Sequence, residues 1–131
     1  PSAILTALVA SGRPTHRFLY LGFLPRRAGE RRRLLKDIAS LPFTLIFLES
    51  PHRLGASLQA MEDVLGPRRI AVGRELTKLH EEFFRGTIPQ AREHFPQPRG
   101  EFTLVVEGAP AQEKSLTPEI AMELLQLRQE G

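Results

Sequence analysis

The stretch LIFLESPHRL, Leu45 to Leu54, decides the fold of this chain. Its apolar first half is typical of a buried strand. A helix is predicted directly after it, with an apolar stripe at Leu54, Leu58, Met61 and Leu65. Ser50 is expected to cap that helix and Pro51 to occupy its first position. A strand that enters a helix through a tight charged turn presents polar groups at the carboxyl end of a sheet, where open α/β sheets bind small ligands.

Extended and helical patterns alternate along the rest of the chain. Strands are predicted at 17–24, 43–48, 69–75, 82–87 and 101–107, and helices at 3–11, 28–41, 51–65, 89–95 and 117–129. This alternation predicts an α/β domain with three layers, α-β-α, around a central sheet. The consecutive strands 69–75 and 82–87 predict a hairpin, and therefore a mixed central sheet rather than a fully parallel one.

Composition sets the limits within which a function can be sought. A chain of 131 residues is long enough for one domain with a real core. It has no cysteine, which excludes disulfides, thiol catalysis and cysteine metal sites. No apolar run approaches the roughly 18 residues of a membrane span, and a cytoplasmic location is expected. The net charge of +3 and the isoelectric point of about 10.0 permit a nucleic-acid partner without requiring one.

Two strand ends carry candidate functional groups. In the turn Glu49-Ser50-Pro51-His52-Arg53, Glu49 is suited to accept hydrogen bonds from a ligand, and Arg53 to bind a phosphate or carboxylate. The alternative is helix capping with a surface ion pair, which contributes little to stability. The second candidate is the turn 73–78, GRELTK, where a glycine inside a strand suggests close approach of another backbone or of a ligand. Solvated charges at a strand end explain that turn equally well.

Glycines mark other special positions. Gly22 is a predicted bulge or close-approach point in the strand 17–24. Gly86 is expected to allow an unusual backbone angle, and Thr87 to cap the helix that follows. Gly100 is expected to let the chain enter the last strand sharply. Backbone contact with a ligand is plausible there.

A basic run occupies the predicted helix 28–41 and the turn before it. Its members are Arg26, Arg27, Arg31, Arg32, Arg33 and Lys36, offset by Glu30 and Asp37. Arginine suits phosphate because its planar fork donates two parallel hydrogen bonds, so the run is a candidate RNA footprint. A solvated helix face is the plainer explanation. The run contains no aromatic residue for base stacking, so sequence readout is not expected there.

Several catalytic motifs are missing. The chain has neither a Walker loop nor a GxGxxG motif. Its histidines, His16, His52, His80 and His94, lack the spacing of metal ligands, so no metal is predicted. No Ser-His-Asp set can be argued from the sequence.

Four blocks of the chain carry a resemblance to a known family. They are PSAILTALVASGRPTHRFLYLGFLP from Pro1, TLIFLESPHRL from Thr44, VGRELTKLHEEFFRGT from Val72 and GEFTLVVEG from Gly100. Together they are similar to the C-terminal domain of the ribosomal RNA small subunit methyltransferase I family, a branch of the tetrapyrrole methylase superfamily. The match extends over about residues 1–108, and the order of the four blocks makes it specific.

The resemblance implies a two-domain protein that holds S-adenosylmethionine in the cleft between two α/β domains. Residues 1–108 correspond to the C-terminal domain, and residues 109–131 to a linker and the start of a further helical segment. The N-terminal domain is expected to be absent from this chain. The family methylates the ribose 2′-hydroxyl of a cytidine in 16S rRNA of the small ribosomal subunit. The resemblance therefore implies that rRNA is the partner, that the full-length protein is a homodimer, and that the isolated chain is inactive.

Matching the motifs residue by residue gives the implied site. Cofactor contacts fall on Leu48, Glu49, Ser50, Leu76, Thr77, Phe102 and Thr103. Arg53, Arg74 and Lys78 match residues on the cleft side and suit rRNA phosphates or the reacting ribose. A ribose hydroxyl needs its proton accepted or its charge stabilised, so Glu49 and Glu75 are candidate bases, with Lys78 or Arg53 as stabilisers. Because one wall of the cleft is missing, Glu49, His52 and Arg53 are expected to be exposed.

Two alternatives remain open. The superfamily also contains methylases of tetrapyrrole or corrin precursors, although the basic run and the ESPHR and RELTK blocks argue against such a substrate. The third hypothesis is a non-enzymatic RNA-binding or dimerisation module, whose RNA affinity would depend strongly on salt.

Overall fold

The structure is a computed structural model that describes residues 7, 12, 17–77, 80–95 and 99–110. At Leu76, Thr77 and His80 it describes the backbone only. The helices expected at 3–11 (apart from Ala7) and at 117–129 lie outside the described residues, as does Lys78.

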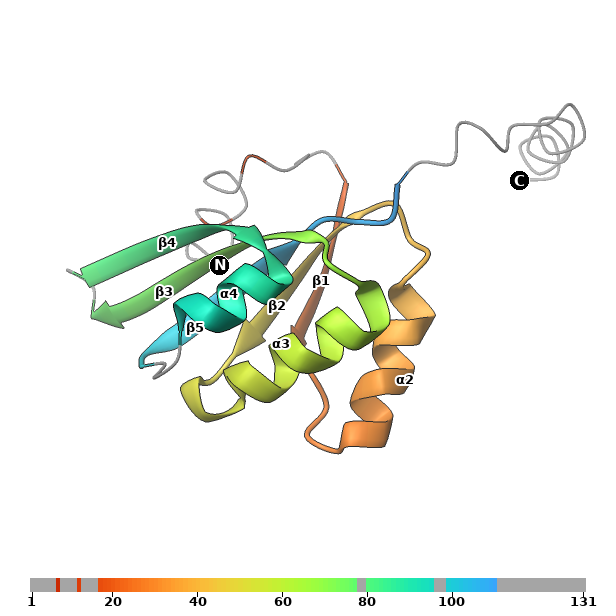
Figure 1. The fold of residues 1–131 in the computed structure, drawn as a ribbon, viewed down its shortest axis with the longest axis horizontal. Helices are drawn as coiled ribbons and strands as arrows, with labels where there is room; N and C mark the ends of the chain where they lie inside the picture. The colour runs from red at the N-terminus through yellow and green to blue at the C-terminus, as the bar shows by residue number, and fades with distance from the viewer. Residues whose placement is uncertain (1–6, 8–11, 13–16, 78–79, 96–98, 111–131) are drawn as a thin grey trace, which may run out of the picture.

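A five-stranded mixed sheet forms the centre of the domain (Figure 1). Its strands are β1 (Phe18–Phe23), β2 (Thr44–Glu49), β3 (Arg69–Thr77), β4 (His80–Thr87) and β5 (Glu101–Val106). They lie in the order β1-β2-β5-β3-β4. Strand β1 is parallel to β2, and the other neighbouring pairs are antiparallel. The predicted hairpin and the predicted mixed sheet are both confirmed.

Helices of the described residues cover one face of this sheet. They are α2 (Ala28–Ile38), α3 (Pro51–Leu65) and α4 (Ile88–His94). Helix α2 connects the parallel strands β1 and β2, a connection that cannot be a tight turn. Figure 1 shows α2 at the β1 end of the sheet, α4 at the β4 end and α3 between them. None of the described helices combines the length and the apolar character that crossing a membrane requires.

The main core lies between the sheet and these helices. Leu45 and Phe47 of β2 point into it and have no exposed surface. The whole apolar stripe predicted for α3 is buried in the same core, because a helix with apolar residues at this spacing buries that face against a sheet. On the opposite face, the helical residue Ala7 is buried with Ile46, Ala71 and Val105. Helical structure therefore contacts both faces, as expected for α-β-α layers.

Helix α2 and the two strands of the hairpin differ from their predicted bounds by more than one residue. Helix α2 ends at Ile38 rather than at Leu41, because the chain turns there and the Leu41 N–H donates to the Ile38 carbonyl at 3.1 Å. The hairpin is longer than predicted, because β3 and β4 stay paired as far as Thr77 opposite His80. The sequence pattern predicted shorter strands because the extra residues are held in the strands by pairing with each other across the hairpin, which a local pattern does not report.

The glycine predictions are confirmed at Gly22 and Gly100 and wrong at Gly86, and at Gly73 the close neighbour is a side chain rather than a backbone or a ligand. Gly22 lies in a β-bulge at φ +67°, and Gly100 precedes β5 at φ +81°. A Cβ on Gly73 would stand 3.1 Å from the ring of Phe83, its partner on β4. Gly86 has no positive φ. It is needed for space instead, since a Cβ there would stand 2.6 Å from Oε1 of Gln90.

The predicted cap at Thr87 is confirmed, and it explains why Gly86 has so little space. The Thr87 hydroxyl accepts a hydrogen bond from the Gln90 N–H at 3.3 Å, and Gln90 Oε1 accepts one from the Thr87 N–H at 2.9 Å. This reciprocal pair is a capping box at the start of α4. The Gln90 side chain reaches back over Gly86 to complete it.

Arg68 ties several elements together at the edge of the sheet away from the Glu49 turn. Its guanidinium donates to the carbonyls of Leu65 at 3.1 Å, Ala39 at 2.6 Å and Glu107 at 3.3 Å. These carbonyls follow or end α3, α2 and β5. Burial lowers the pKa of Arg68, and the nearby Glu107 carboxylate opposes this effect. The sequence analysis did not single out Arg68, since nothing local marks it among many arginines.

Candidate functional site at the carboxyl edge of β2 and β3

Three neighbouring strands bring the predicted site residues together. Phe102 at the start of β5 lies between Glu49 of β2 and Arg74 of β3 in the register of the sheet. One step further in, Thr103 lies between Leu48 and Gly73. Because β5 is antiparallel to both neighbours, its first residues lie beside their last ones. Residues 25 or more positions apart in the chain thus meet at one edge of the sheet.

Glu75 lies at the same edge, opposite Glu101 on β5 and Glu81 on β4. Its side chain is exposed. The backbone of Leu76 and Thr77 continues β3 beyond it. The edge therefore combines a partly exposed apolar side chain, Leu48, with an exposed carboxylate, Glu75.

Glu49 is buried rather than exposed, which corrects the expectation for this residue. It is 2% exposed. Its Oε1 accepts a hydrogen bond from the Ser50 N–H at 2.9 Å, and its Oε2 accepts one from the Ser57 hydroxyl at 2.5 Å. A buried carboxylate must have such partners, because an unpaired one would be very costly. The predicted turn is therefore held from inside the domain.

Ser57 is a site residue that the sequence analysis missed. It lies on α3 and is 1% exposed, among the apolar residues of the buried face. A polar side chain on the apolar face of a helix needs a buried partner, and this signal was present in the sequence. Its partner lies eight residues earlier, on a strand, and only the packing of α3 on β2 identifies it.

The start of α3 differs from the predicted cap in one respect. Ser50 occupies the N-cap position and Pro51 the first turn, as predicted, but the Ser50 side chain makes no capping hydrogen bond. Its hydroxyl instead accepts one from Nε of Arg53 at 3.3 Å. Ser50 thereby serves to orient a cation.

Arg53 is held in place on several sides. Its Nε lies 3.5 Å from Oε1 of Glu49, and its guanidinium carbon lies 5.9 Å from the centre of the Phe23 ring. The side chain is 25% exposed, so the expectation of an exposed residue is met only in part, whereas His52 is exposed. Phe23, at the end of β1, is 55% exposed and was also missed by the sequence analysis.

Arg74 belongs to a network between β3, β4 and α4. It forms an ion pair with Glu82, and its guanidinium carbon lies 5.6 Å from the centre of the Phe95 ring. Glu82 also contacts Nε2 of His94 at 3.0 Å. The Nε of Arg74 is buried and has no hydrogen-bond partner among the described residues. A buried donor of this kind is costly to leave unpaired, so an acceptor is expected nearby.

The basic run lies along α2, apart from the edge formed by β2, β5 and β3. The guanidinium of Arg31 donates hydrogen bonds to the backbone carbonyls of Pro25 at 3.3 Å and Arg26 at 2.9 Å. Arg32 pairs with Asp63 of α3 at 2.9 Å. Arg26, Arg27, Arg33 and Lys36 are exposed. The run thus divides into arginines that hold the fold and cations that face solvent.

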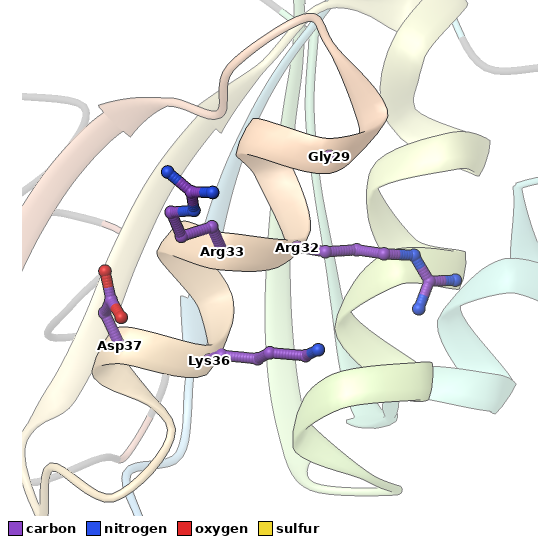
Figure 2. A pocket seen from close by; sticks show the side chains of 5 residues that line it. All are labelled: Gly29, Arg32, Arg33, Lys36 and Asp37. Atoms are coloured by element: carbon purple, nitrogen blue, oxygen red, sulfur yellow. The ribbon is translucent and has the colours of Figure 1, made fainter.

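A hollow of about 370 Å³ lies on the outer side of α2. It is lined by Gly29, Arg32, Arg33, Lys36 and Asp37. Figure 2 shows Arg32 and Lys36 pointing to one side of the helix, and Arg33 and Asp37 to the other. In the ranges that the structure describes, no cluster of histidine, aspartate and glutamate could hold a metal ion.

The mixed five-stranded sheet with its helices defines an α/β domain. The chain belongs to the family Tetrapyrrole (Corrin/Porphyrin) Methylases, whose model matches residues 1–92. This finding confirms the resemblance inferred from the four sequence blocks.

Curated relatives extend this similarity to one branch of the family. Ribosomal RNA small subunit methyltransferase I of Halalkalibacterium halodurans is 48% identical over 110 residues, which cover 82% of this chain and 38% of that protein. The protein of the same name from Bacillus subtilis is 50% identical, with 82% and 38% covered. The one from Thermotoga maritima is 44% identical, with 82% and 49% covered. The chain thus spans less than half the length of these relatives.

Solved structures agree on the fold. The methyltransferase CobJ matches with a TM-score of 0.60 at 19% identity, over 80% of this chain and 47% of that chain. The cobalamin biosynthetic enzyme cobalt precorrin-4 methyltransferase matches with a TM-score of 0.54 at 15% identity, over 79% and 48%. At these identities the likeness supports the fold alone.

Proposed function

We propose that the chain is the C-terminal domain of an S-adenosylmethionine-dependent methyltransferase that acts on the ribose 2′-hydroxyl of a cytidine in 16S rRNA. The observation that carries the proposal is the 44 to 50% identity to ribosomal RNA small subunit methyltransferase I over 82% of the chain. In this proposal residues 1–108 form the domain, residues 109–131 lead into a further segment, and another domain completes the cleft. A cytoplasmic homodimer stays a prediction.

The residues at the carboxyl edge fit the proposed cofactor. S-adenosylmethionine has a flat adenine, ribose hydroxyls and a charged amino-acid end. Leu48 offers a partly exposed apolar side chain, whereas the Phe102 ring is 1% exposed and leaves only its backbone for a ligand. The unpaired Nε of Arg74 offers a donor for a carboxylate or hydroxyl oxygen. The backbone of Leu76 and Thr77 and the side chains of Ser50 and Thr103 border the same edge. When bound, the cofactor supplies an electrophilic methyl group, and the protein has to align it with the 2′-oxygen.

The geometry supports different roles for the two candidate bases. Both carboxylate oxygens of Glu49 are engaged within the domain, so we assign Glu49 to positioning Ser50 and Arg53. Glu75 is exposed at the edge and is the better candidate for accepting the proton of the ribose hydroxyl. Arg53 and Lys78 are the proposed stabilisers of the developing charge.

The RNA contacts are proposed on the cations of the carboxyl edge and on the exposed cations of α2. Arg53 and Arg74 lie at the edge where the ribose has to arrive. Arg26, Arg27 and Arg33 face solvent on and before α2, whereas Arg31 and Arg32 have partners in the fold. We therefore expect Arg31 and Arg32 to contribute less to RNA binding than their neighbours.

Methyl transfer from labelled S-adenosylmethionine to small-subunit RNA tests the proposal. The full-length protein should place one ribose methyl on a cytidine, detected by mapping 2′-O-methylated positions. Glu75→Gln should lower the turnover number by about a hundredfold or more, the usual contribution of a general base. The matched control Glu93→Gln, on the exposed side of α4, should leave it unchanged.

The opposite results are equally clear. An unmethylated RNA together with methyl transfer to a corrin precursor would replace the proposal by the small-molecule alternative. RNA binding without any transfer would favour the non-enzymatic module. Turnover by the purified 131-residue chain alone would contradict the prediction that a second domain is needed.

A further inference from the structure

Three aromatic side chains stand exposed in a row on β1. Phe18 is 43% exposed, Tyr20 46% and Phe23 55%. Strand β1 is at the edge of the sheet, and its other side chains Leu19 and Leu21 pack against the main core. Phe83 is the other large hydrophobic residue that is exposed within the described ranges, and it lies on β4 at the opposite edge.

The bulge at Gly22 puts all three rings on the same face of the sheet. Phe18 pairs with Thr44, Tyr20 with Ile46 and Phe23 with Leu48, which are alternate residues of β2. Alternate residues of a strand point to one face, and paired residues on neighbouring strands share it. Without the extra residue between Tyr20 and Gly22, Phe23 would point to the core with Leu19 and Leu21. The bulge thus extends the row to the carboxyl edge.

Cations stand at both ends of this row. Arg17, exposed, precedes Phe18, and the guanidinium of Arg53 lies over Phe23. The paired β2 residues on this face, Thr44, Ile46 and Leu48, carry no charge. The hydroxyl of Tyr20 lies 3.7 Å from where a Cβ on Gly22 would stand, so its ring lies along the strand toward Phe23. Flat exposed rings between cations complement a polyanion with flat bases.

We propose that Phe18, Tyr20 and Phe23 form a stacking platform for single-stranded RNA next to the methylated nucleotide. Alternate residues of a strand are about 6.6 Å apart, and exposed aromatics on a sheet stack two or three successive bases in other RNA-binding domains. The bases lie on β1, and the phosphates reach Arg17, Arg53 and the solvent-facing cations of α2. This inference rests on the proposed function, because it takes RNA as the substrate.

RNA affinity of the full-length protein tests the platform. The probe is a single-stranded 16S rRNA fragment that contains the methylated cytidine. Phe18→Ala and Tyr20→Ala should each weaken binding on the order of tenfold, as removal of a stacking ring does. The slope of log affinity against log salt should stay unchanged, because stacking releases no counterions. Tyr20→Phe keeps the ring and should keep the affinity, and Phe83→Ala is the matched control.

The failures of this inference and of the proposed function can be told apart. If wild-type protein methylates the RNA and the alanine variants bind it as tightly as wild type, the platform is wrong and the function stands. If the variants change the sedimentation of the protein or its melting temperature by several degrees without changing RNA affinity, a second copy or another segment of the protein covers the row, which also overturns the platform. If wild-type protein neither binds nor methylates the RNA, both proposals fail.

Discussion

Glu49 shows how much a single buried carboxylate can organise. Its two oxygens accept hydrogen bonds from Ser50 and Ser57, and Arg53 completes the group. The backbone bond fixes the turn after β2, and the Ser57 bond joins that turn to α3. Arg53 is thereby presented at the edge before any ligand arrives, which lowers the cost of ordering it on binding.

Replacing Ser57 tests this arrangement at the residue scale. Ser57→Ala removes the donor to a buried carboxylate, so the free energy of unfolding should fall by about 1–3 kcal/mol. Urea denaturation measures the change, and Ser40→Ala, at an exposed position, should have almost none. Equal stability of the Ser57 variant and wild type would mean that Glu49 does not depend on this bond.

At the scale of elements, Arg68 links segments at the far edge of the sheet, as Glu49 links the turn after β2 to α3 at the carboxyl edge. One guanidinium satisfies carbonyls from three segments, two of which are also joined by the hydrogen bond from the Ala109 N–H to the Leu41 carbonyl. Burial lowers the pKa of Arg68, which means that folding opposes its charged form. When a basic group has a lower pKa in the folded state than in the unfolded state, it reduces the free energy of unfolding, and this reduction is fully present at any pH below the folded-state pKa. Because arginine remains protonated in proteins, this cost does not vary from about pH 5 to 9.

Removing this side chain should loosen the helix ends. Arg68→Met keeps the apolar stem and leaves three carbonyls without their donor, so we expect a loss of about 2–4 kcal/mol in the free energy of unfolding. The adjacent Arg69→Met, at an exposed position, is the matched control and should lose far less. Thermal or urea unfolding at two pH values, about 6 and 8, should show the same loss at both.

At the scale of the whole molecule, charge and aromatic surface gather around one end of the sheet. Strand β1 has exposed rings on one face, and α2, at the same end of the sheet, carries the exposed cations Arg33 and Lys36 (Figure 1). The opposite end carries Glu81, Glu82 and Glu93 as well as arginines, so its charges are mixed. A protein with this distribution is expected to meet a polyanion at the β1 end first.

Removing the positive charges of Arg33 and Lys36 on α2 tests whether RNA approaches the β1 end of the sheet. Arg33→Gln combined with Lys36→Gln should reduce the slope of log RNA affinity against log salt by between about one and two, since each lost phosphate contact on a single strand removes roughly 0.7. Arg69→Gln, exposed at the start of β3 and away from the carboxyl edge, should leave the slope within error. Identical slopes for the double variant and wild type would place the RNA elsewhere.

The predictions from sequence succeeded where the information is local. The alternation of apolar residues located the strands and helices, and the capping residues located the starts of α3 and α4. The stretch from Leu45 to Leu54 was correctly predicted as a buried strand, a charged turn and an amphipathic helix. The edge that gathers Leu48, Glu49, Phe102 and Thr103 was implied by family resemblance, and its cofactor and catalytic roles stay predictions.

The sequence by itself determined the elements, the mixed sheet and the family, because periodicity, caps and ordered motifs are written in neighbouring residues. Only the tertiary structure decided that Glu49 is buried against Ser57, that Arg31 and Arg32 are engaged within the fold, and that a bulge turns Phe23 to the exposed face. These features depend on which strands and helices lie side by side. Burial and pairing are set by contacts between residues far apart in the chain, and a local sequence pattern does not predict those contacts.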